Sequence, residues 1–270
     1  MRKYLELFRQ GFDSTVEEKR SLENWPYVGH DVNGGVVYTV IPAKEEPITW
    51  DPYVTFKAEA DNSSIGLFKL STSQTLEYST DTTTWTTFNT TTNITLNNGD
   101  KVYVRGVLSN NNNSSSNYTQ FKMTGKIAAS GNCNALWNYE DLNAPLKNHC
   151  GRNMFYNCRS LITAPKILPA TTLADYCYSN MFADCTSLTT APELPATELA
   201  YSCYSSMFFN CTKLNHIKCL ATNISATSCT SGWVSIVSST GTFVKHPDMA
   251  SWSTGKDGIP EEWTVVDAEL

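Results

Sequence analysis

Nine cysteines are the residues most able to carry chemistry in this 270-residue chain, and their spacing limits what that chemistry can be. No Cys-x-x-Cys pair occurs, so a zinc ribbon or a thioredoxin-type redox motif has no starting point. The odd count leaves at least one thiol that cannot be bridged within the chain. Cys150, Cys177, Cys203 and Cys229 are instead separated by 27, 26 and 26 residues. This regular period indicates a structural repeat.

The histidines and acidic residues form no recognisable catalytic or metal-binding motif. HExxH, a nucleophile elbow, a Walker loop and a dinucleotide fingerprint are all missing from the sequence. His149 adjoins Cys150 in the sequence. The side chains of adjacent residues at the start of a helix point in different directions, so we expect no thiol–imidazole pair. Glu261 and Glu262 are typical of a solvated acidic face. We therefore predict no enzyme activity, no cofactor and no metal. The enzyme alternative, a carbohydrate-active sheet domain, would need two facing carboxylates, whereas the acidic residues of 53–128 fall mostly at turns.

Composition and charge exclude further classes. The net charge is −6 and the pI about 5.2, so the basic field needed for nucleic-acid binding is missing. No apolar run approaches the roughly 18 residues of a membrane span. The first residues, 1–11, lack the apolar region of a secretory leader. Only 17% of residues are charged, and Ser, Thr and Asn are abundant, which favours a β-rich surface protein.

The repeat units can be aligned on their cysteines. They read CGRNMFYNC from Cys150, CYSNMFADC from Cys177 and CYSSMFFNC from Cys203. A degraded fourth copy starts at Cys229, and residues 133–148 form an irregular first turn. The predicted repeat core consists of Cys150, Met154, Phe155, Cys158, Cys177, Met181, Phe182, Cys185, Cys203, Met207, Phe208 and Cys211. Three full copies between atypical ends are what a stacked array requires.

Each unit is predicted to hold one helix and one strand. Apolar residues between Leu173 and Cys185 fall at helical spacing and cover one face, which predicts an amphipathic helix. The stretch 188–195 carries two prolines, which have no backbone N–H. It can therefore only be a short strand that donates few hydrogen bonds to its neighbours in a sheet. One strand and one helix per 26 residues lies within the leucine-rich-repeat range of about 20–29 residues.

The strings MFxxCxSLTxAPxLPAT and LAxxCY resemble the BspA-like leucine-rich repeats of Bacteroides-type surface proteins, which are also found in phages of those bacteria. The ending at 241–265, GTFVKHPDMASWSTGKDGIPEEWTV, resembles the segment that closes such arrays. The resemblance covers roughly residues 123–266. It implies a leucine-rich-repeat α/β solenoid over 129–239 with a C-terminal cap over 240–270. The third copy departs from the pattern at 216–219, so its strand is expected to differ.

The cysteines are expected to be reduced and buried. Cys177 and Cys185 would lie about 12 Å apart along one helix, and equivalent helices in a stack lie about 8–10 Å apart. A disulfide needs Cα atoms within about 7 Å. We therefore interpret the thiols as small apolar core side chains.

Residues 53–128 predict an antiparallel β-sandwich-like domain. Alternating segments begin at Tyr53, Leu76 and Lys101, with turn signals between them. The run NNNNSSSN at 110–117 predicts a polar loop within this domain.

Residues 1–52 are interpreted as an anchor and oligomerisation segment. One or two short helices are expected within 1–24, and two alternating segments flank DVNGG at 31–35, which predicts a hairpin. The candidate assembly contacts are Trp25, Pro26, Tyr27, Val28, Val37 and Tyr38. The alternative is local packing onto the sheet domain. The predicted fold class is therefore α+β: a helix and hairpin anchor, the sheet domain, and a short capped solenoid.

The favoured function is a non-enzymatic structural virion protein, a head fibre or decoration protein displaying adhesive repeats. The expected location is the virion surface, because lysis would release a protein that has no leader. The expected partners are further copies of the chain (a trimer, or a dimer), a capsid or other virion protein held through residues 1–52, and a host surface glycan. Tyr176, Tyr178, Tyr201 and Tyr204 could stack on sugars or belong to the core. The alternative is a bacterial cell-surface adhesin.

Overall fold

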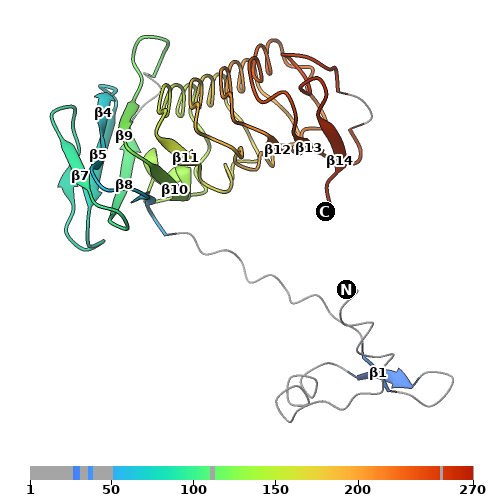
Figure 1. The fold of residues 1–270 in the computed structure, drawn as a ribbon, viewed down its shortest axis with the longest axis horizontal. Coiled ribbons are helices and arrows are strands. Elements are labelled where there is room, and N and C mark those ends of the chain that lie inside the picture. The colour runs from blue at the N-terminus through green and yellow to red at the C-terminus, as the bar shows by residue number, and fades with distance from the viewer. Residues whose placement is uncertain (1–26, 31–35, 39–50, 110–112, 250–251, 270) are drawn as a thin grey trace. The chain divides into compact units, whose positions relative to one another are not determined.

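The computed structural model describes residues 27–30, 36–38, 51–109, 113–249 and 252–269 (Figure 1). The chain divides into two compact units, Met1–Thr49 and Trp50–Leu270. In the first unit, β1 (Tyr27–His30) and β2 (Val36–Tyr38) pair antiparallel and match the arms of the predicted hairpin. Its turn, the helices expected within 1–24, and the candidate contacts Trp25 and Pro26 lie outside the described residues.

The second unit is built mainly from strands. They are β3 (Val54–Ala58), β4 (Ser63–Lys69), β5 (Gln74–Ser79), β6 (Thr86–Thr87), β7 (Asn93–Leu96), β8 (Lys101–Leu108), β9 (Gln120–Thr124), β10 (Ile127–Gly131), β11 (Leu161–Thr163), β12 (His216–Cys219), β13 (Thr242–Lys245) and β14 (Thr264–Asp267). Their sheet orders are β11-β10-β3-β8-β5-β6, β7-β4-β9 and β12-β13-β14. Among the described residues the one helix is the short 3₁₀ element η1 (Cys133–Leu136). The prediction that helices share this unit with strands is therefore wrong.

The antiparallel strands predicted within residues 53–128 are confirmed. Burial alternates along β8, where Val102 and Val104 are buried and Tyr103 between them is partly exposed. Phe56 of β3 and Phe121 of β9 come from different sheets, and their ring centroids lie 5.2 Å apart. The alternating pattern therefore places an apolar core between two sheets, whose strands within residues 53–128 all pair antiparallel.

The repeats stack through their backbones. We call residues 149–158, 176–185, 202–211 and 228–236 the turn segments; they form the row of narrow coils along one side of the second unit in Figure 1. In the first segment, alternate N–H groups bond to the carbonyl three residues back. The remaining donors, His149, Gly151, Asn153, Phe155 and Asn157, reach the carbonyls of Asp175, Cys177, Ser179, Met181 and Ala183. The same pattern recurs at the next two steps, so a ladder of hydrogen bonds runs along the stack.

The amphipathic helix predicted between Leu173 and Cys185 is wrong, because the turn segments consist of four-residue turns. Every fourth residue has a positive φ: His149, Asn153, Asn157, Tyr176, Asn180, Asp184, Ser202, Ser206, Asn210, Ser228, Gly232 and Ile236. An α-helix keeps φ near −63° throughout and bonds four residues back. The apolar pairs Cys177–Tyr178 and Met181–Phe182 recur every four residues, close enough to 3.6 to imitate a helical face. The predicted inward face is nevertheless buried from Cys177 to Cys185, while Leu173 and Ala174 are partly buried.

The interior of the stack consists of aligned columns. The ring of Phe182 stacks on Phe155 at 5.3 Å and on Phe208 at 5.8 Å. The Cys185 thiol donates to the Phe155 carbonyl at 3.1 Å, and the Cys211 thiol donates to the Phe182 carbonyl at 3.0 Å. Cysteine suits these positions because it is small and apolar and still offers a donor to a buried carbonyl.

The proline-containing stretch 188–195 forms isolated bridges rather than the short strand that we expected. Thr190 pairs with His216, and Leu194 pairs with Cys219. Pro192 and Pro195 have no N–H to donate, which limits the ladder. The third repeat lacks these prolines and forms β12, which starts the parallel sheet β12-β13-β14. The third copy therefore differs, as expected, by being the more regular strand.

Both ends of the stack are covered. At the first end the Phe121 N–H of β9 donates to the Met154 carbonyl at 2.9 Å, and β10 pairs parallel with β11. At the other end Trp252 stacks on Trp233 at 5.7 Å, and the Trp233 Nε1–H donates to the Gly258 carbonyl at 2.8 Å. The sheet domain and the C-terminal segment thus satisfy backbone and apolar groups that the outer coils would otherwise expose.

Candidate ligand-binding cavity between the coils

The residues predicted as repeat core lie inside the second unit. All twelve are buried, with exposed fractions of 2% or less. Of the candidate assembly contacts, Tyr27 and Val28 lie on β1, and Val37 and Tyr38 lie on β2. The repeat-core residues are therefore packed within the Trp50–Leu270 unit, whereas the four described assembly candidates lie on the strand pair of the Met1–Thr49 unit.

The nine thiols are positioned for packing rather than reaction. All are buried and unbridged. Burial raises the pKa of Cys133, Cys150 and Cys219 to about 12, so these thiols stay protonated at neutral pH. Because the thiolate is the nucleophile, these cysteines are inert. The Cys150 thiol points to the carbonyl of Cys177 at 3.9 Å and makes no hydrogen bond to His149.

Two of the four candidate tyrosines are core residues, and two are at the surface. Tyr178 and Tyr204 are buried and stack on each other at 6.3 Å. Tyr201 is 42% exposed and makes an edge-to-face contact with Tyr176 at 5.1 Å, and His149 stacks on Tyr176 at 4.6 Å. Burial, together with the nearby Arg152 guanidinium, lowers the pKa of His149, so the imidazole is neutral at pH 7. The stacked imidazole of His149 covers part of the Tyr176 ring, whereas Tyr201 keeps much of its surface exposed.

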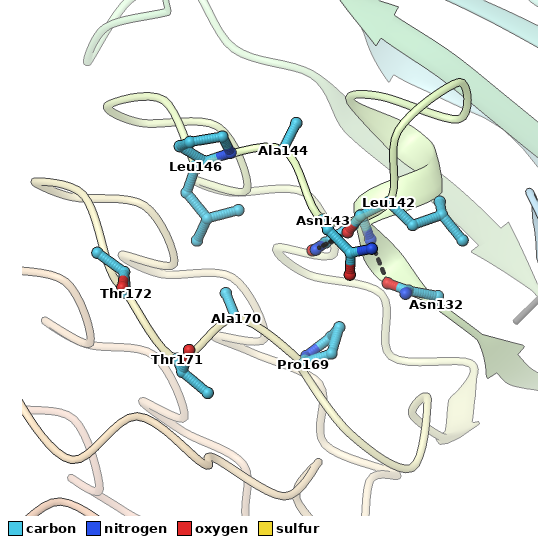
Figure 2. Close-up of a pocket in the computed structure, with 11 residues that line it drawn as sticks. Asn132, Leu142, Asn143, Ala144, Leu146, Pro169, Ala170, Thr171 and Thr172 are labelled. Carbon is cyan, nitrogen blue, oxygen red and sulfur yellow. Dashed lines mark hydrogen bonds between the residues drawn. The ribbon is translucent and has the colours of Figure 1, made fainter. Parts of the chain in front are cut away.

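One candidate site is a cavity of about 380 Å³ between two loops of the stack. Figure 2 shows Asn132, Leu142 and Asn143 on one side of it and the segment 169–172 facing them. The loop 142–146 comes from the irregular first turn, and 169–172 belongs to the later part of the first full repeat. The lining consists of Asn132, Asn134, Leu142, Asn143, Ala144, Pro145, Leu146, Pro169, Ala170, Thr171 and Thr172. This lining carries no ionisable side chain.

The short helix η1 fixes the floor of the cavity. Asn132 caps η1, and its Oδ1 accepts from the Asn134 N–H at 2.8 Å. The Asn134 Nδ2 donates to the Leu142 carbonyl at 2.7 Å, which ties the loop 142–146 to the helix. The Asn134 Oδ1 has no hydrogen-bond partner among the described residues, although Asn134 is only 5% exposed. A buried acceptor without a partner is unusual in a folded protein.

A second cavity of about 320 Å³ lies one coil further along the stack. It shares Thr171 and Thr172 with the first, and its opposite wall is formed by residues 197–200. Glu198 gives it a carboxylate. The two cavities therefore differ in charge although they repeat in position.

Sequence reasoning missed the first cavity. Its asparagines belong to 132–143, a part of the chain that fits no repeat and offered no motif to align. The remaining signal was the concentration of Asn and Pro beside Thr in 132–146 and 169–172, which predicts loops but not a cavity.

Other classes of site find little support in the described part of the chain. No group of three or more His, Cys, Asp or Glu side chains is placed there to hold a metal ion. No helix among those residues is long and apolar enough to cross a membrane. Comparison with family models, with curated proteins and with solved structures gave no match.

Proposed function

We propose that this chain is a non-enzymatic display protein: a structural virion protein, a head fibre or decoration protein, that presents a repeat array to the host surface. The Met1–Thr49 unit is the attachment segment, and the Trp50–Leu270 unit is the displayed body. The repeat array is a leucine-rich-repeat solenoid of the BspA-like kind, in which four-residue turns replace the helix. The sheet domain and the C-terminal segment are its caps.

The observation that carries this proposal is the backbone ladder between the turn segments. Each of the first three segments donates from alternate residues to the next, and both ends of the stack are covered. A body held in this way keeps its loops in fixed relative positions. Rigid loops on a stacked scaffold suit recognition, because little conformational entropy is lost on binding.

The division of the chain supports separate attachment and display roles. The boundary between the two compact units falls between residues 49 and 50. In the first unit β1 and β2 make a two-stranded pair, and such a pair is marginal in water unless it packs against something else. Assembly of three copies, or of two, and contact with a capsid or other virion protein would supply that packing.

Weak contacts suffice for a protein displayed in many copies. Linking binding events through one particle raises the overall avidity by roughly 10²–10⁴ when geometry allows simultaneous contact. A shallow site for a host surface glycan could therefore function without high intrinsic affinity.

Removal of residues 1–49 tests the proposal. We expect the truncated protein to keep the unfolding transition of the full-length chain, to sediment as a monomer, and to be lost from assembled particles. The full-length chain should sediment as a trimer or dimer and join the particles. A truncated protein that still assembled would contradict the role given to the first unit.

A further inference from the structure

We propose that the first cavity binds one unit of a neutral, hydroxyl-rich ligand: an uncharged monosaccharide, either free or at the end of a glycan. This inference deepens the proposed display function, because it names the site and the chemical class that the displayed body would recognise. It depends on the charge, the hydrogen-bonding groups and the size of the cavity.

The charge of the lining selects against ions. No Lys, Arg, His, Asp or Glu is among its residues. A phosphate, sulfate or carboxylate bound there would lose its hydration without gaining an opposite charge. The neighbouring cavity carries Glu198 and would disfavour an acidic ligand more strongly. An uncharged ligand is therefore the class that the first cavity fits.

The polar groups of the lining match hydroxyls. Asn132 and Asn143 bring side-chain amides to the lining, and the Asn132 Nδ2 makes no hydrogen bond to another described residue. A hydroxyl can accept from one amide and donate to another. Thr171 and Thr172 bring further hydroxyls from the facing loop. A ligand with several hydroxyls could thus bond to both loops at once.

The remaining lining suits the C–H faces of a sugar ring. Leu142, Leu146, Pro169 and Ala170 supply apolar atoms between the polar groups. Ligand sites commonly have volumes of about 300–1,000 Å³ and combine apolar walls with a few placed polar groups. A cavity of about 380 Å³ lies at the small end of that range, which favours a single sugar unit.

The test uses the full-length protein and ligand-observed NMR titrations. The neutral probes are methyl glycosides of glucose, galactose, mannose, fucose and N-acetylglucosamine. The charged probes are glucuronic acid and N-acetylneuraminic acid. We expect weak binding of at least one neutral probe and none of the charged probes. An oligosaccharide ending in the same sugar distinguishes the two sources: equal or tighter binding assigns the site to a glycan end, and exclusion assigns it to the free sugar.

The variant Thr171→Trp places a large side chain in the cavity mouth from an exposed loop position. It should weaken binding about tenfold or more. The matched control is Thr227→Trp. Thr227 is exposed on the third repeat, and the equivalent position of the preceding repeat is an aromatic residue, Tyr201. The control should bind like the unaltered protein, and both variants should unfold at the same urea concentration as the parent. Asn143→Ala offers a second, smaller change in the lining and should also weaken binding.

The outcomes separate this inference from the proposed function. Failure of every neutral probe to bind would overturn the inference, as would tighter binding of the charged probes. Unchanged affinity in both Thr171→Trp and Asn143→Ala would place the ligand elsewhere on the body and also overturn it. None of these results would affect particle assembly, which tests the proposed function by itself.

Discussion

Asn180 offers a direct test of the four-residue turns, because alanine and glycine respond to backbone conformation in opposite ways. Its φ is 54°, in the left-handed region. Its N–H donates to the Ser205 carbonyl at 2.9 Å, and its Nδ2 donates to the Ser179 hydroxyl at 3.1 Å. Asn180→Ala and Asn180→Gly both remove the side-chain bond and keep the backbone bond. The difference between these two variants therefore isolates the conformational preference.

The size of the difference follows from two opposing effects. A residue with a Cβ loses about 1–2 kcal/mol in the left-handed conformation, which glycine avoids. Glycine loses about 0.4–1 kcal/mol more chain entropy on folding. The Asn180→Gly variant should thus be more stable than the Asn180→Ala variant by about 0.5–1 kcal/mol. In an α-helix the order would reverse, because glycine is less favourable than alanine there by about 1 kcal/mol.

Urea unfolding of the two Asn180 variants, followed by tryptophan fluorescence, measures the difference. A control pair at Ser205, which has no positive φ, is Ser205→Ala and Ser205→Gly. Here the alanine variant should be the more stable by about 0.5–1 kcal/mol, the usual cost of glycine at an ordinary position. If alanine were also more stable at position 180, the four-residue turns would be refuted.

Three further predictions concern the interior and the surface of the stack. Phe182→Ala should lower the free energy of unfolding by about 3–5 kcal/mol, because the ring is fully buried between two other rings. Tyr156→Ala is the control, and it should lower the free energy of unfolding much less, because Tyr156 is 38% exposed. The nine buried thiols should resist a thiol reagent in the native protein and all react in denaturant, and rapid native labelling would contradict their burial. His149 has a lowered pKa in the folded protein, so the unfolded chain binds more protons and the stability should fall as the pH drops below about 6.5. The variant His149→Gln should reduce this loss of stability. An unchanged pH profile in the variant would assign the loss to other groups.

The sequence was sufficient to predict which residues of each repeat lie inside. The pairs Cys177–Tyr178 and Met181–Phe182 fall on one face at a period of either 3.6 or four residues, so burial did not depend on the correct local structure. The helix was mistaken because three turns are too few for the two periods to separate. Polar residues with left-handed preference, such as Asn180 and Asp184, recur every four residues and were the available signal.

The strands of the sheet domain were predictable because successive side chains of a strand point to opposite faces of the sheet, so burial alternates along the sequence. The cavity was not, since it depends on how two loops, 142–146 and 169–172, meet across the stack. The hydrogen bond from Asn134 to the Leu142 carbonyl sets one of these loops. Such a contact joins residues of no periodic pattern, and sequence alone does not indicate it.

Mass spectrometry of purified phage particles, alongside the outer-membrane fraction of the host, tests the proposed role most directly. We predict this chain in the particles in a fixed ratio to the capsid protein, with peptides from both the Met1–Thr49 unit and the repeats. Its presence only in the cell envelope, with none in the particles, would contradict the virion role and favour a bacterial surface adhesin.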